Sequence, residues 1–241
     1  MIFMMVLAPV FIAPLFNKYT ALTDAKVRDP ILSMARANGV PADNVYQFDA
    51  SKQSKRVSAN VSGALNTIRV SLNDNLLNRC SPQEVQAVMG HELGHYVLNH
   101  IYKMVIDFTL LICAGFWFTH WFYSWASRRF GAAWGLRGID DFAGLPLLLA
   151  GLAIFMAIAT PIRNTIIRTS EVEADIFGLN AARQPDGFAT TALKLSEYRK
   201  LAPGKWEEIF FFDHPSGYNR ILMAMRWKAE HLAEIPTPPK K

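Results

Sequence analysis

The sequence of 241 residues predicts a mainly helical α+β protein with a small β-sheet and two transmembrane helices. Composition is the first reason: 51% of the residues are hydrophobic, 19% are charged, and the mean hydropathy is +0.12. Soluble domains usually carry about 25% charged residues. Two apolar stretches are long enough to cross a bilayer, and three short β-rich segments precede them. The same composition excludes disordered, collagen-like and disulfide-scaffold proteins.

Charge and cysteine content exclude further classes. The net charge is +5, and the basic residues are scattered without a run of five or more like charges. We therefore expect no nucleic-acid partner. Cys80 and Cys113 fit no metal or redox spacing, so we expect two free thiols.

The first element is the apolar segment from Ile2 to Phe16, which contains Pro9 and Pro14. It is shorter than the roughly 20 residues that a helix needs to span a bilayer. It also lacks the basic start and the cleavage site of a signal peptide. We expect residues 1–16 to be a partial or N-terminal membrane segment, the end of a membrane helix whose beginning is missing.

A polar region follows and predicts a small sheet and then a helix. Ser, Gly and Asn residues separate its three β-rich segments, which are Val45–Phe48, Arg56–Val61 and Thr67–Leu72. Ser81, Pro82 and Glu84 then have the spacing of an N-cap, a first helical residue and a capping box. We therefore expect a helix to begin at Ser81.

Two apolar stretches, about 104–126 and 142–162, predict membrane spans joined by a short turn. Tryptophans followed by Arg128 and Arg129 at the end of the first are typical of a membrane interface. The alternative is a buried helical hairpin of a soluble protein. The helical pattern then continues to about Arg183 and stops at Pro185. The last predicted elements are helices near 187–201 and 216–232 and a disordered tail at 236–241.

The strongest chemical signal is the H-E-x-x-H motif formed by His91, Glu92 and His95. Residues four apart share one face of a helix, so both imidazoles can reach one zinc ion. Glu92 lies beside them, where it can take a proton from the attacking water. A helix with two coincidental surface histidines is the alternative.

A catalytic zinc needs a third protein ligand, and Glu171 is the best candidate. Glu171 and Asp175 are also four residues apart, so one can bind the metal while the other accepts a hydrogen bond from a ligand histidine. Glu173 is the second candidate for the ligand. The two predicted spans lie between the two motifs, and two spans return the chain to the same membrane face. We therefore expect Glu171 to emerge beside His91.

His214, in Phe212-Asp213-His214-Pro215-Ser216, and Arg220 form a further candidate pair. Alone, His214 is more typical of a surface histidine at a helix start. The other three histidines are assigned no role: His100 lies off the predicted metal face, His120 lies near a membrane interface, and His231 lies in the tail.

Together, these motifs resemble the integral-membrane zinc endopeptidases that include the type 1 CAAX prenyl protease and the HtpX heat-shock protease. The matching pieces keep their order: 91–95, two spans, 171–175, then His214-Pro215 with Arg220. Pro14–Lys18 and Ser58–Gly63 resemble the prenyl-protease branch more. The resemblance covers most of Asn17 to Leu232.

The resemblance implies a zincin-like (gluzincin) fold, with the two spans inserted between the H-E-x-x-H helix and the E-x-x-x-D helix. One Zn²⁺ is implied on His91, His95 and Glu171, with Glu92 as the base and Asp175 hydrogen-bonded to a ligand. His214 and Arg220 are implied to contact the substrate or the tetrahedral intermediate. Residues 17–235 would form the metallopeptidase domain.

Two features differ from the prenyl-protease branch. Several further membrane helices precede the matching region in that branch, and the edge-strand sequence Asn-Ala-Tyr reads Ser58-Ala59-Asn60 here. Three interpretations therefore stay open: processing of CAAX-like C-terminal peptides, cleavage of damaged membrane proteins, and a truncated, non-catalytic zinc-binding membrane protein. In either enzyme, we expect the substrate to bind as an extra strand along Ser58–Gly63.

Charge predicts the orientation in the membrane. The turn between the spans offsets its arginines with Asp140 and Asp141, whereas basic residues dominate the side of the site. These residues are Lys18, Lys26, Arg28, Lys52, Lys55, Arg56, Arg163 and Arg168. The positive-inside rule then places the active site on the cytoplasmic face of a bacterial inner membrane or an endoplasmic-reticulum-like membrane.

Overall fold

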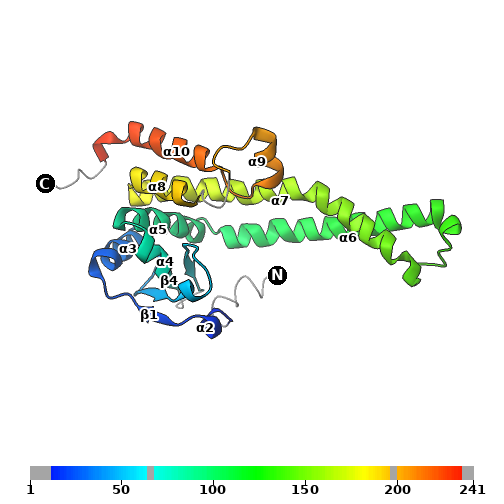
Figure 1. Ribbon diagram of the computed structural model, residues 1–241, viewed down its shortest axis with the longest axis horizontal. Helices are drawn as coiled ribbons and strands as arrows, with labels where there is room; N and C mark the ends of the chain where they lie inside the picture. Colours follow the sequence, from blue (N-terminus) through cyan, green and yellow to red (C-terminus); the bar gives the residue numbers. More distant parts are fainter. Residues whose placement is uncertain (1–11, 64–67, 196–199, 235–241) are drawn as a thin grey trace.

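The computed structural model describes residues 12–63, 68–195 and 200–234. Helices stack over a small sheet at one end, and a long helical hairpin projects from the other (Figure 1). The predicted mainly helical α+β fold is confirmed. The first eleven residues of the predicted membrane segment 1–16 and the predicted tail 236–241 lie outside the described residues, and α2 (Ala13–Phe16) is the first described α-helix.

The sheet is mixed and has four strands in the order β1-β2-β4-β3. The strands are β1 (Tyr19–Ala21), β2 (Val45–Phe48), β3 (Ala59–Ser62) and β4 (Arg69–Asn73). β2 and β4 are parallel, and the other pairs are antiparallel. Within the described residues, β3 pairs with a strand on one side only, so it is an edge strand.

The three predicted strands are present, but two have shifted bounds: β3 is Ala59–Ser62 rather than Arg56–Val61, and β4 is Arg69–Asn73 rather than Thr67–Leu72. β2 has its predicted bounds, and the three-residue β1 was not predicted. β3 begins at Ala59 rather than Arg56 because the Asn73 side chain holds the residues before it. The Asn73 amide accepts from Ser58 N at 3.1 Å and donates to Arg56 O at 2.7 Å. These side-chain contacts stand beside the backbone hydrogen bond from Asn73 N to Ser58 O at 2.9 Å.

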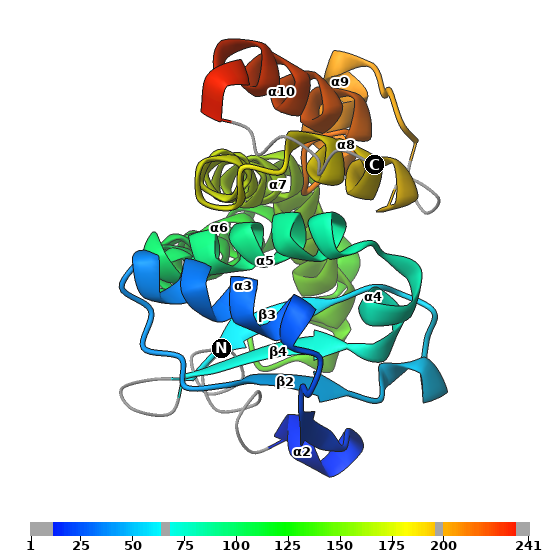
Figure 2. The same cartoon turned by 90° about the vertical axis from the view of Figure 1, so that its left-hand side faces the viewer.

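Helices α3 (Ala25–Ala37), α4 (Asp74–Arg79) and α5 (Pro82–Val97) pack on the sheet (Figure 2). α5 begins as predicted: Ser81 Oγ accepts from Glu84 N, and Glu84 Oε2 accepts from Ser81 N at 2.6 Å. The main hydrophobic core lies between α5, α3 and the sheet. Its fully buried members include Ile31, Leu72, Met89 and Leu93.

The projecting hairpin consists of α6 (His100–Trp134) and α7 (Leu145–Ala182), joined by a turn that contains the short η4 (Phe142–Gly144). The first predicted span, 104–126, lies inside α6, and the second, 142–162, begins in η4 and continues into α7. The stretches His100–Trp134 and Phe142–Ala182 are long and apolar enough to cross a membrane. Large apolar side chains face outward: Phe116 is 74% exposed and Trp117 69%. Such exposure favours a lipid environment over the buried hairpin of a soluble protein.

The last helices are α8 (Pro185–Leu195), α9 (Lys205–Phe211) and α10 (Gly217–Glu230). Two short 3₁₀ turns complete the described elements, η2 (Ala50–Lys52) and η6 (Leu232–Glu234). Pro185 begins α8, because the first turn of a helix needs no N–H from this position. α9 was not predicted. Figure 2 shows α8 and α10 above α5, so α5 lies between them and the sheet.

Candidate active site

Helices α5 and α7 approach unusually closely because small residues line their contact. Gly90 and Gly94 of α5 lie against Gly178 and Ala174 of α7. A Cβ atom at Gly178 would lie 2.7 Å from the backbone nitrogen of His91, so this position requires glycine. The close approach places the part of α7 around Ala174 and Gly178 directly beside the H-E-x-x-H motif.

Three side chains from these helices converge as the sequence predicts. His91 Nε2 lies 3.0 Å from His95 Nε2 and 3.3 Å from Glu171 Oε2. His95 Nε2 lies 3.5 Å from Glu171 Oε1. Tetrahedral zinc with ligands at about 2.0–2.1 Å requires donor atoms about 3.3 Å apart. The two imidazoles and the carboxylate therefore fit a zinc ion.

Asp175 stands behind His91 and is completely buried. Its Oδ1 accepts a hydrogen bond from His91 Nδ1 at 2.7 Å, which leaves His91 Nε2 facing Glu171. Arg220 binds both Asp175 oxygens, with Nε at 2.9 Å and Nη2 at 2.5 Å. Arg220 also lies over the Phe188 ring at 5.0 Å and lines the cleft described below, so its expected contact with substrate stays a prediction.

The surroundings of the three motif residues raise the pKa of two of them and lower the pKa of the third. Burial opposes protonation of His91, but hydrogen bonds to Asp175 and Glu171 outweigh it and raise its pKa to about 10. Burial raises the pKa of Glu92 to about 7. Burial, followed by the positive charge on His91, lowers the pKa of His95 to about 4. A carboxyl that titrates near 7 is suited to general acid–base chemistry at neutral pH.

His214 reaches the same cluster from the loop between α9 and α10. Its Nε2 lies 3.4 Å from Glu171 Oε2, and its Nδ1 lies 2.9 Å from Asp213 Oδ1. Arg168 holds the start of this loop, donating from Nη1 to the carbonyl oxygens of Glu208 at 3.0 Å and Phe212 at 2.6 Å. In the sequence, Arg168 is recognisable only as a basic residue that flanks the second span, because a contact across forty residues leaves no local pattern.

His100 and Glu173 lie differently from their sequence-based assignments. The helix breaks at Asn99, whose φ is +56°, and the chain turns so that His100 is buried against the motif. His100 Nδ1 lies 2.9 Å from His95 Nδ1, and its Nε2 lies 3.1 Å from Glu173 Oε2. Glu173, the second candidate for the ligand, therefore contacts His100. A helix that continued past Asn99 would have turned His100 away from the metal face, as the sequence predicts.

A cleft of about 230 Å³ opens over these residues. Ser58 and Ala59, at the start of the edge strand, form one wall, and α5, α7, α8 and α10 form the rest. Its polar residues include His91, Glu92, Glu171, His214 and Arg220. An adjoining hollow of about 260 Å³ shares Val57, His214 and Arg220 with it. The start of β3 and the H-E-x-x-H motif therefore face the same cleft.

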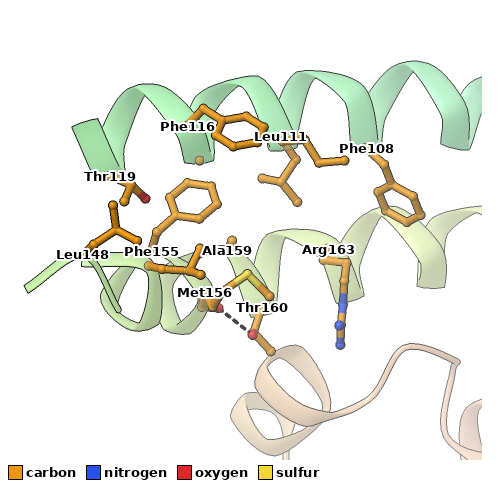
Figure 3. A pocket seen from close by; sticks show the side chains of 13 residues that line it. Phe108, Leu111, Phe116, Thr119, Leu148, Phe155, Met156, Ala159, Thr160 and Arg163 are labelled. Carbon is orange, nitrogen blue, oxygen red and sulfur yellow. Dashed lines mark hydrogen bonds between the residues drawn. The ribbon is translucent and has the colours of Figure 1, made fainter. Parts of the chain in front are cut away.

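A larger hollow, of about 430 Å³, lies between α6 and α7, away from this site. Figure 3 shows Leu111, Phe116 and Phe155 around it, with Arg163 at one end. Its lining is almost wholly apolar, and none of the predicted catalytic or metal-binding residues line it. It has no acid–base chemistry of its own.

Comparison with known proteins assigns the chain to a family. Residues 21–228 match the profile of peptidase family M48. The chain belongs to peptidase family M48. The match covers both motifs, both long helices and the His214 loop.

Individual M48 relatives agree with this assignment. The chain is 31% identical over 225 residues to an uncharacterized metalloprotease, YhfN, of Bacillus subtilis, covering 92% of this chain and 53% of that protein. It is 28% identical over 234 residues to a CAAX prenyl protease 1 homolog of Oryza sativa, covering 90% and 51%. Its fold matches the crystal structure of S. mikatae Ste24p with a TM-score of 0.77 and 26% identity, covering 92% and 55%. The chain thus spans about half the length of these relatives.

Proposed function

We propose that this M48 chain is a zinc-dependent membrane metalloendopeptidase that holds one Zn²⁺ on His91, His95 and Glu171. The convergence of these three side chains to within 3.5 Å of one another, beside Glu92 in an open cleft, carries the proposal. If the two histidines shared a helix face only by chance, we would not expect a carboxylate some eighty residues later in the chain to lie beside both of them. Asp175 orients His91, as carboxylates commonly do for zinc-bound histidines.

Each residue of the site is proposed to have its own role in peptide hydrolysis. Bound zinc supplies Lewis-acid chemistry that makes water nucleophilic near neutral pH. The Glu92 carboxylate takes the proton from the attacking water and then delivers it to the leaving amine nitrogen. His214, with Nε2 close to Glu171, is placed to donate a hydrogen bond to the oxyanion that develops on the scissile carbonyl. Arg220 acts through Asp175, and its paired charge keeps that carboxylate ionised.

The substrate is proposed to bind as an additional strand on β3. The edge of β3 that pairs with no strand of the described residues can make main-chain hydrogen bonds to an extended peptide. Ser58 and Ala59 lead this edge into the cleft, which would place a peptide bond over Glu92. Main-chain recognition of this kind depends little on side-chain sequence.

CAAX-like C-terminal peptides are the first substrates to test, because several relatives are CAAX prenyl proteases. Damaged membrane proteins are the second class. The long apolar helices are proposed to span the bilayer with the cleft on the cytoplasmic side, where the basic residues of the domain would obey the positive-inside rule. A bacterial inner membrane or an endoplasmic-reticulum-like membrane fits this arrangement.

The test is zinc content and peptide cleavage by the detergent-purified protein and its Glu92→Gln variant. We expect one zinc per chain in both and cleavage by the wild type alone. The exposed control Glu230→Gln should leave both properties unchanged. Zinc binding without cleavage by the wild type would support a non-catalytic zinc protein, and absence of zinc from the wild type would refute the site.

A further inference from the structure

A polar relay leads away from the candidate zinc site behind His95, as Asp175 lies behind His91. His95 Nδ1 contacts His100 Nδ1 at 2.9 Å, and His100 Nε2 contacts Glu173 Oε2 at 3.1 Å. Lys103 Nζ lies 3.1 Å from the same Glu173 oxygen and 3.3 Å from the other. We propose that His100 is a positioning residue that holds the tautomer and ring orientation of His95, with Glu173 and Lys103 holding His100. This inference rests on the proposed zinc site.

The hydrogen-bond chemistry allows one consistent arrangement. His95 Nε2 faces His91 and Glu171, so it must be unprotonated to bind a metal. The proton of neutral His95 then sits on Nδ1 and is donated to His100 Nδ1. His100 in turn carries its proton on Nε2 and donates it to Glu173. Each donor in this chain meets an acceptor, and each imidazole is neutral.

Burial makes this arrangement specific. The His100 ring is only 2% exposed, so water cannot replace a lost partner freely. His91 has a carboxylate, Asp175, behind its Nδ1, whereas the first group behind His95 is an imidazole. The Asn99 turn brings His100 into place, since its positive φ ends α5 and starts α6. The two candidate ligand histidines thus have different supports, one from α7 and one from α6.

The hydrogen-bond geometry of the relay determines which substitutions at position 100 test the proposal. An asparagine at position 100 can place its amide oxygen near the position of Nδ1 and accept from His95. A glutamine places its amide near the position of Nε2, towards Glu173, and leaves His95 Nδ1 without its acceptor. A leucine removes both contacts. The exposed His120 of the same helix, changed to leucine, is the matched control.

Zinc affinity is measured by competition with a chromogenic chelator on the detergent-purified full chain. We expect His100→Leu and His100→Gln to bind zinc about 10–100-fold more weakly, the usual loss for a group that orients a ligand. His100→Asn should recover most of this loss, and His120→Leu should match the wild type. The visible spectrum of the Co²⁺-loaded protein should change in the same order.

Equal zinc affinity in the wild type, His100→Leu and His100→Gln would overturn the inference while leaving the zinc site intact. So would equal losses in the asparagine and glutamine variants, which would indicate a packing role. If His100→Leu does not fold, the comparison of asparagine with glutamine decides. Failure of the wild type to bind zinc would instead refute the proposed function.

Discussion

Arg220 and Asp175 form a two-contact ion pair in the interior, with Nε on Oδ2 at 2.9 Å and Nη2 on Oδ1 at 2.5 Å. Asp175 is completely buried, and the Arg220 side chain is 13% exposed. The pair joins α10 to α7 behind His91. It therefore connects the C-terminal helix to the candidate zinc site and explains why a residue beyond the His214 loop belongs to the motif.

Removing one member of this pair should cost more stability than any surface ion pair. Arg220→Met leaves the Asp175 charge buried without its cation, and we expect a loss of about 3–5 kcal/mol in the free energy of unfolding. Denaturant unfolding of the metal-free protein in detergent measures it. The control Lys228→Met breaks an exposed pair with Asp186 and should cost no more than about 1 kcal/mol. Equal losses in both variants would contradict the buried-pair interpretation.

The two acidic candidates on α7 should behave differently towards zinc. Glu171→Gln removes the charged donor near both histidines, so we expect zinc binding to fall below detection. Glu173→Gln changes the far end of the His100 relay and should weaken binding less than about 10-fold. Chelator competition and zinc content of the purified variants check both values. Stronger loss in Glu173→Gln than in Glu171→Gln would reassign the ligand.

The close contact between α5 and α7 predicts an unusual sensitivity to one methyl group. In Gly178→Ala, the new Cβ would lie 2.7 Å from His91 N and 3.1 Å from His91 Cα, and backbone atoms cannot rotate away. We expect a destabilisation of about 1–3 kcal/mol from overpacking and weaker zinc binding as His91 shifts. Thermal unfolding and chelator competition measure the two effects. Gly131→Ala, where the nearest atom lies at 3.8 Å, should be tolerated.

The Glu84 carboxylate at the start of α5 is expected to make the protein less stable at acid pH. Burial opposes ionisation of Glu84, but hydrogen bonds from Lys194 at 2.8 Å and from Ser81 N at 2.6 Å outweigh it, and the pKa of Glu84 lies below 4.5. A carboxyl whose pKa is lower in the folded state stabilises the protein above about pH 4.5 and loses this contribution as the pH falls.

We therefore expect Glu84→Gln to lower stability at pH 7 and to reduce the drop in unfolding free energy between pH 7 and pH 3. Denaturant unfolding of the metal-free protein at the two pH values measures this difference. Glu230→Gln, at an exposed position of α10, controls for the lost charge. An unchanged pH dependence in Glu84→Gln would show that other carboxyls account for the acid sensitivity.

Several features could be predicted from the sequence because they depend only on residues that are close together along the chain. The capping box at Ser81 starts α5 where it was predicted, because it needs only residues three apart. The helical period alone puts His91 and His95 on one face. Hydropathy locates the cores of α6 and α7, since a span requires about 20 apolar residues in a row. The E-x-x-x-D spacing and the two intervening spans indicated Glu171 and Asp175 as candidates, and the family resemblance then implied the role of each.

Tertiary packing decided the rest. Gly90, Gly94 and Gly178 permit the close helix contact that brings Glu171 to His91. The presence of glycines in a sequence does not show which helix packs against them. The turn at Asn99 redirects His100 onto His95, where helical periodicity had placed it elsewhere. Arg220 meets Asp175 across 45 residues. The sequence by itself determined the two histidines and their helix, and it indicated Glu171 and Asp175 as candidates. Their meeting with the histidines, and the places of His100 and Arg220, depend on long-range contacts, which no local period encodes.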